Sequence, residues 1–289
     1  MDCLSNCRIN LVIYKAHSRV RELAGGVMLY GIGQWWLFLL MLIGFYLCAE
    51  VGFRFGRRGH QQFNKDSLTH VSTIEGALLG LLALLLGFAF SMAMGRFDDR
   101  RAVVLGEVND LATTDLRAKL LPEPHQTQSH KLLGQYVASR LEYLRAGSDR
   151  DLINRSLKET TELQKLLWNE AVNAARLDSD EVRTGYFIES LNSLIDDHTR
   201  RVAAMENHVP EIITALLLVV AGMTIAITGY SSGLNKARLA IPRFILILLT
   251  SLTLLVIIDL DRPRRGFIKV SEQGMVELQK QFFEEGAGK

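Results

Sequence analysis

Two clusters of charged side chains in this sequence could bind an ion. Arg96, Arg100 and Arg101 form a basic cluster, and Asp259 and Asp261 form an acidic one. Carboxylates bind divalent cations, but Ca²⁺ takes about six to eight oxygen ligands. Two aspartates supply few of these ligands, and neighbouring arginines repel a cation. We therefore favour pairing of the aspartates with the arginines at the ends of membrane helices. A divalent-cation site on Asp259 and Asp261 is the less favoured alternative.

The remaining polar residues show no arrangement typical of an enzyme. The seven histidines are scattered, and His125 and His130 lack the i, i+4 spacing of a helical metal pair. Cys3 and Cys7 have no third or fourth ligand nearby, so we expect free thiols rather than a zinc site. The sequence contains no glycine-rich phosphate loop and no nucleophile elbow. We therefore expect no catalysis, no cofactor and no bound metal.

The apolar residues are concentrated in four blocks, and most of the charge lies between them. The chain of 289 residues is 48% hydrophobic and 22% charged. A membrane-spanning helix needs about 20 mostly apolar residues. The sequence therefore predicts an all-α polytopic membrane protein with four transmembrane helices, near residues 32–53, 76–95, 212–230 and 243–258.

The spans follow a two-plus-two arrangement around a large insert. The predicted segments are a basic lead-in (1–31), spans one and two (32–95), a helical domain (96–208), spans three and four (209–260) and a tail (261–289). Lys and Arg residues close to the spans are more numerous on the side of the termini and the insert, and such residues favour the cytoplasm. We expect a bacterial inner-membrane protein with both termini and the insert in the cytoplasm.

The insert is expected to be a cytoplasmic helical bundle. It carries 16 basic and 19 acidic residues, so it offers no basic patch of the kind that binds nucleic acid. Apolar residues recur with helical periodicity, in stripes that include Leu166, Trp168 and Tyr186, and Pro122 and Pro124 end the first segment. The predicted helices cover 97–121, which continues span two without a break, then 126–145, 152–176 and 181–208, with a tail helix at 271–285 docked on the bundle.

Span two carries a face of small residues at spacings of four, three, four and four, namely Gly76, Gly80, Ala83, Gly87 and Ser91. Such faces let membrane helices approach closely, so packing against a neighbouring span is the favoured role of the glycines. Alternatively, Gly80, Leu84 and Phe88 face an axis where several copies meet, because apolar constrictions gate ion flow by dewetting. In a symmetric oligomer, basic rings that suit an anion path would come from Arg54, Arg57, Arg58, Arg96, Arg100 and Arg101. The more common role of such arginines is at ordinary solvated ends of spans, in contact with lipid phosphates.

Several motifs are similar to those of a known family. They are LLGFAFSMAMGRFDDRR at 85–101, LRAKLLP at 116–122, QYVASRL at 135–141, VPEII at 209–213, GYSSG at 229–233 and DLDRP at 259–263. From about residue 30 to 285 the chain resembles the bestrophin-like domain family of bacterial membrane proteins, formerly a domain of unknown function. It is more distantly similar to the bestrophin anion channels, through the span-two motif and the two-plus-two layout.

The resemblance to bestrophins implies a pentamer in which span two lines a central anion pore. The neck of that pore falls on Gly80, Leu84 and Phe88, and Gly80 is small enough to leave the constriction looser. After Arg96 only one aromatic residue follows, because Asp98 takes the place of the second. The segment DLDRPRRG lacks the acidic run with which bestrophins clasp Ca²⁺, so Ca²⁺ gating is not expected here.

We therefore expect a homo-oligomeric ion channel, for anions, with span two lining the pore. Its partners are the lipid bilayer, further copies of the chain and inorganic anions, and nucleic acid is not among them. The alternative is a non-conducting, membrane-anchored helical sensor or docking module whose insert does the work. The channel requires Phe88 to face the centre of the assembly. It is disfavoured if span two is buried within each protomer with its glycine face against span three.

Overall fold

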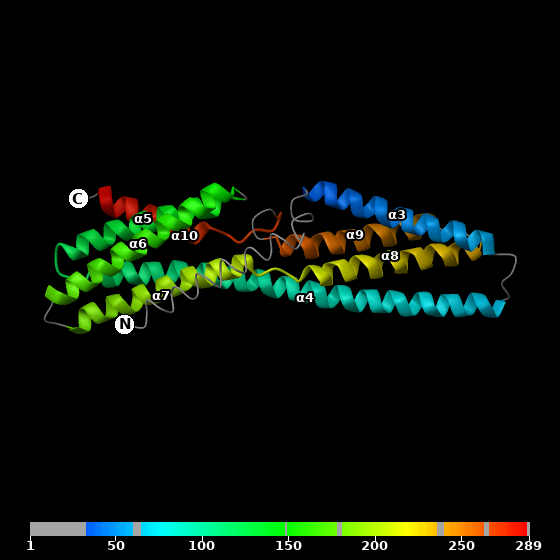
Figure 1. The fold of residues 1–289 in the computed structure, drawn as a ribbon, viewed down its shortest axis with the longest axis horizontal. Helices are drawn as coiled ribbons and strands as arrows, with labels where there is room; N and C mark the ends of the chain where they lie inside the picture. Colours follow the sequence, from blue (N-terminus) through cyan, green and yellow to red (C-terminus); the bar gives the residue numbers. More distant parts are fainter. Residues whose placement is uncertain are drawn as a thin grey trace. The chain divides into compact units, whose positions relative to one another are not determined.

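The computed structural model describes residues 33–59, 65–147, 149–177, 181–235, 240–262 and 266–287. These residues form helices and no strand (Figure 1), as the sequence predicts. The predicted lead-in (1–31), including Cys3 and Cys7, lies outside the described residues. The helices are α3 (Gln34–Gly59), α4 (Lys65–Ala118), α5 (His125–Arg145), α6 (Arg150–Leu177), α7 (Glu181–Glu206), α8 (Glu211–Leu234), α9 (Ala240–Leu260) and α10 (Gln273–Ala287).

The chain divides into two compact units. The membrane unit comprises Met1–Met92 and Val209–Asp259, and the polar unit comprises Ala93–His208 and Leu260–Lys289. Helix α4 contributes residues to both units, because it continues through Arg96 without a break. The prediction that the second span runs on into the insert as one helix is therefore confirmed.

Four helical ranges are long and apolar enough to cross a membrane, namely Gln34–Arg58, Thr69–Ala118, Val182–Leu234 and Ala240–Leu260. Pro210 directly precedes α8, as predicted. The fourth span begins earlier than predicted, because α9 starts at Ala240 and includes Pro242 in its first turn. Proline is tolerated there, since the first N–H groups of a helix have no partner within it.

Helices α3 and α8 of the membrane unit pack with their backbones in contact at glycines. A Cβ atom added at Gly52 or Gly56 of α3 would collide with carbonyl oxygens of α8. A Cβ atom at Gly229 or Gly233 would in turn collide with carbonyl oxygens of α3. Both helices thus present a Gly-x3-Gly pair at their crossing, the spacing that lets membrane helices approach closely.

The hydrophobic core of the polar unit is formed by α5, α6, α7 and α10 with residues of α4. Its most deeply buried members include Leu111, Leu133, Val137, Leu167 and Leu191. The tail helix is part of this core, because Met275 and Leu278 of α10 are buried in it. The predicted docking of the tail on the bundle is therefore confirmed.

The predicted apolar stripes were wrong for three residues, because Leu166, Trp168 and Tyr186 are exposed. The buried face of α6 consists instead of Ser156, Thr160, Leu163, Leu167, Ala171 and Ala174. The Thr160 hydroxyl donates to the Ser156 backbone carbonyl and lies 3.2 Å from the Ser139 hydroxyl, so this face is partly polar and the apolar pattern alone misplaces it. Tyr186 lies at the surface with the Arg117 guanidinium 5.6 Å above its ring centroid.

Candidate functional site

The predicted neck residues lie on an uncovered face of α4 in the membrane unit. Leu84 is 55% exposed and Phe88 is 64% exposed in the single chain. A Cβ atom added at Gly80 would meet no atom within 4 Å. The opposite side of the helix carries Leu82 and Ala89, which are buried. Helix α4 therefore turns one side into its unit and leaves the strip of Gly80, Leu84 and Phe88 uncovered.

The small-residue face lies beside this strip and is also open. A Cβ atom at Gly76 or Gly87 would meet no atom within 4 Å, and Ala83 and Ser91 are exposed. Among the described residues of one chain, these glycines therefore do not serve as a contact for a neighbouring span. A role for this face in contacts between chains stays a prediction.

Two arginines of the basic cluster donate hydrogen bonds to groups of the polar unit, and the Asp261 carboxylate also attracts the Arg100 guanidinium. The buried Arg100 donates a hydrogen bond to the Leu260 carbonyl, and Arg96 donates to the Asn207 side chain. Pairing of Arg96, Arg100 or Arg101 with Asp259 or Asp261 stays a prediction. Arg101 is exposed at the surface.

The two aspartates of the acidic cluster belong to different units. The Asp261 carboxylate lies 3.9 Å from Nδ1 of His208, within the polar unit. Asp259 belongs to the membrane unit, and its pairing with the arginines stays a prediction. The described residues contain no group of three or more His, Cys, Asp or Glu side chains that could hold a metal ion.

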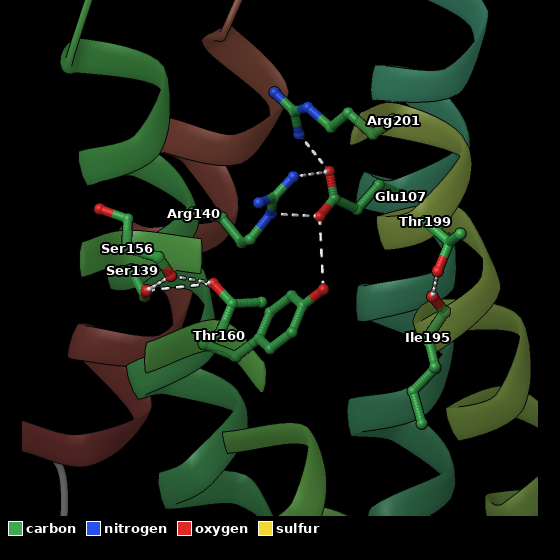
Figure 2. A network of polar contacts seen from close by, with 9 residues as sticks. Glu107, Ser139, Arg140, Ser156, Thr160, Ile195, Thr199 and Arg201 are labelled. Carbon is green, nitrogen blue, oxygen red and sulfur yellow. Dashed lines mark hydrogen bonds and ion pairs between the residues drawn. The ribbon is translucent and has the colours of Figure 1, made fainter. Parts of the chain in front are cut away.

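A buried ionic network in the polar unit was not predicted from the sequence. The Glu107 carboxylate of α4 accepts hydrogen bonds from Arg140 of α5, whose Nε lies 2.6 Å from Oε1. Arg201 of α7 donates to the other carboxylate oxygen, and the Tyr136 hydroxyl donates to Oε1 over 3.4 Å. Figure 2 shows both guanidinium groups turned toward the same carboxylate. All four side chains are buried.

This network contains two buried cations and one buried anion. Burial alone would lower the pKa of Arg140, but the Glu107 carboxylate outweighs this effect and the pKa is raised. Burial and the same carboxylate raise the pKa of Tyr136, which stays protonated and donates at neutral pH. Charges removed from water are stable only when paired and hydrogen-bonded, so three helices are tied together through one carboxylate.

One signal in the sequence could have revealed this network. Arg140 follows Tyr136 by four residues and Val137 by three, so it lies on the apolar stripe of α5. Glu107 likewise lies on the apolar stripe of α4, because it follows Val104 by three residues and precedes Leu111 by four. A charged residue within an apolar stripe is typical of a buried ion pair, because an unpaired charge would not be buried there.

Comparison with known proteins identifies the family. Residues 43–275 match the model of the bestrophin-like domain, which covers well over half of the chain. No curated protein sequence matches.

Similar folds occur among solved structures. A mutant crystal structure of a bacterial bestrophin homologue from Klebsiella pneumoniae has a TM-score of 0.65 and 16% identity, over 87% of this chain and 98% of that chain. A second crystal structure of the homologue has a TM-score of 0.61 and 16% identity, over 88% and 98%. A crystal structure described only as a membrane protein has a TM-score of 0.57 and 14% identity, over 89% and 99%. At these identities the likeness shows a shared fold, and together with the matched residues it shows that this membrane protein belongs to the bestrophin-like domain family.

Proposed function

We propose that the chain forms a homo-oligomeric channel for anions, in which α4 of each copy lines the pore. The observation that carries this proposal is the exposure of Leu84 and Phe88 beside Gly80, on a helix apolar enough to cross a membrane. Large apolar side chains around an axis form a constriction that gates ion flow by dewetting. The distant similarity to bestrophin anion channels supports the same arrangement.

The layout that we propose has two spans, the cytoplasmic helical domain of 96–208, and two further spans. Both termini would lie in the cytoplasm of a bacterium, and 209–260 and 32–95 would form the membrane part. This orientation is supported by the excess of Lys and Arg near the spans on that side. The four apolar helical ranges occur in the order that it requires.

The preference for anions follows in this proposal from arginines near the ends of the spans. Arg54, Arg57 and Arg58 of α3 are exposed, as is Arg101 of α4. In a symmetric oligomer each would be repeated around the axis. Rings of basic side chains lower the energy of an anion and raise that of a cation at the pore entrances.

The experiment is an anion-flux assay on liposomes that contain the purified full-length chain. Leu84→Ala and Phe88→Ala are compared with wild type, and Phe90→Ala is the matched control. Phe90 is also exposed on α4, but it is two residues from Phe88 and so points to a different side of the helix. We expect altered flux for the first two variants and wild-type flux for Phe90→Ala.

Two results would contradict the channel. Absence of flux in wild type and in every variant would leave the non-conducting sensor or docking module as the better interpretation. A monomeric mass in detergent, measured by light scattering with the detergent contribution subtracted, would remove the axis that the pore requires. Equal changes in all three variants would place the neck elsewhere.

A further inference from the structure

The polar unit contains a cavity of about 290 Å³ whose lining is rich in cations. Arg201 of α7, Arg145 of α5 and Lys269 line it, together with Ser271, Tyr143 and one carboxylate, Glu272. Arg145 and Lys269 are exposed, whereas Arg201 is only 1% exposed. The cavity therefore has one buried cation in its wall and two exposed cations close to solvent. A volume of this size holds several water molecules, or one phosphate group with a small substituent.

Arg201 is only partly used by the buried network. Its Nη1 donates to Glu107, while Nε and Nη2 are buried and have no hydrogen-bond partner among the residues that the structure describes. Figure 2 shows the second terminal nitrogen of Arg201 turned away from the carboxylate. Nε and Nη2 form one edge of the guanidinium, and this edge donates two parallel hydrogen bonds to two oxygens of one carboxylate or phosphate. A buried donor without a partner is costly, so this edge favours a bound acceptor.

Among the described side chains that line the cavity, three cations face one carboxylate. Arg140, Arg145, Arg201 and Lys269 supply four positive charges in and beside it, against the carboxylates of Glu107 and Glu272. Glu107 is already shared between Arg140 and Arg201. The excess of positive charge, partly removed from water, attracts an anion to this place.

We propose that this cavity binds an oxyanion of the phosphate class, with the free edge of Arg201 holding two oxygens and Arg145 and Lys269 closing over it. The guanidinium edge matches two oxygen atoms of one group, so phosphate is favoured over chloride. The ligand is a dissolved phosphate or small phosphate ester, or the phosphate headgroup of a lipid. This site is separate from the proposed neck on α4, and its occupation does not depend on conduction.

The test is to titrate the full-length chain in detergent with inorganic phosphate. Binding is measured by calorimetry, and stability is measured as the midpoint of thermal unfolding. We expect saturable binding and a rise of the midpoint, since a ligand that binds only the folded state stabilises it. Exposed side chains offer variants that leave the buried network intact, namely Arg145→Gln and Lys269→Gln. Each should raise Kd by about tenfold, since a hydrogen bond to a charged group is worth that much. Lys165→Gln, an exposed residue of α6 paired with Glu162, is the matched control and should bind as wild type does.

The source of the phosphate is decided by competition with phosphate already bound. Displacement by a short-chain phosphatidate but not by glycerol 3-phosphate would assign a lipid headgroup, and the reverse would assign a dissolved ester. Absence of saturable phosphate binding would overturn the proposal, as would unchanged affinity in the Arg145→Gln, Lys269→Gln double variant. Equal affinity for phosphate and chloride would overturn the oxyanion preference. None of these results depends on anion flux. If the channel proposal fails, the phosphate site is unaffected, and if the phosphate site fails, the channel proposal is unaffected.

Discussion

Gly52 of α3 lies so close to the carbonyl oxygen of Ala226 in α8 that no side chain fits between them. The same two helices repeat this contact one turn further along, at Gly56 and Tyr230. In a membrane, helices gain little from burying apolar surface against each other, so close packing of small residues contributes much of their association. The glycines therefore allow the backbones of α3 and α8 to pack closely, and this close packing stabilises the pair.

We expect Gly52→Ala to destabilise the membrane unit, because the added methyl group must push two helix backbones apart. Overpacking of this kind costs about 1–3 kcal/mol, seen as a lower midpoint of thermal unfolding in detergent. Gly44→Ala on the same helix is the control, since a Cβ atom there meets nothing within 4 Å. That change should leave the midpoint unchanged or raise it slightly, because alanine favours helix more than glycine. Similar losses in both variants would show that the contact is not the cause.

Much of the fold could be predicted because hydrophobic pattern and proline positions depend on short stretches of sequence. The apolar blocks, the continuity of α4 through Arg96 and the buried face of α10 all follow from such local signals. The apolar pattern ends span one at residue 53 and so leaves Gly56 outside it, and for this reason the sequence does not predict the α3–α8 contact. Pairing of GFRFG at 52–56 with GYSSG at 229–233 depends on two segments far apart in the chain, and no local pattern in either one specifies its partner.

The candidate sites also depend on contacts between distant segments, which local sequence patterns do not specify. Leu84 and Phe88 could be placed on one face of a helix from their spacing alone, but which side of that helix is covered depends on its neighbours. In the sequence, Glu107 is one of 19 acidic residues in the insert. Its burial results from three helices converging on one carboxylate, and that convergence is a property of the tertiary structure.

We expect Glu107→Gln to destabilise the polar unit by about 3–5 kcal/mol, because it leaves two buried guanidinium groups without their carboxylate. Glu189→Gln is the matched control. That carboxylate is also paired with an arginine, Arg117 at 3.1 Å, but its side chain is 69% exposed. Exposed pairs contribute about 1 kcal/mol or less. Denaturant unfolding followed by circular dichroism should separate the two variants, and similar losses would contradict a stabilising role of the buried network.

Tyr136→Phe tests the buried network through the pH dependence of the free energy of unfolding. At pH 7 the variant should be about 1 kcal/mol less stable, since it loses one hydrogen bond to Glu107. The pKa of Tyr136 is raised in the folded state by burial and by Glu107, above the ordinary tyrosine value of 10.0. Above pH 10 the unfolded chain therefore releases this proton while the folded chain retains it.

The consequence is a difference in the pH dependence of the two proteins. Wild type should lose up to about 1.4 kcal/mol per pH unit above pH 10 through this group, and Tyr136→Phe should not. The gap between their free energies of unfolding should thus narrow as the pH rises from 10. Tyr186→Phe, at an exposed tyrosine, should follow wild type throughout. A constant gap from pH 8 to 11 would contradict the raised pKa.

The docked tail should stabilise the polar unit through Met275, which is fully buried in its core. Met275→Ala leaves a cavity and should cost about 2–5 kcal/mol, as large-to-small core substitutions do. Phe283→Ala on the same helix is the control, because that ring is 69% exposed. We expect limited proteolysis to remove the tail faster in the first variant only. Equal rates for both variants would argue that α10 is held by other contacts.

Gly80→Leu distinguishes an effect on the proposed pore neck from an effect on the stability of the fold. A Cβ atom at Gly80 meets no atom within 4 Å in the single chain, so the larger side chain should leave the thermal midpoint unchanged. If α4 lines a pore, each copy would add an apolar side chain one turn from Leu84 and narrow the constriction, so that anion flux falls. Gly44→Leu on α3, where the space is equally open, is the control and should conduct as wild type does. Normal flux in Gly80→Leu would place this face of α4 against lipid. A lower midpoint of thermal unfolding, together with dissociation of the oligomer, would instead place this face in a contact between chains.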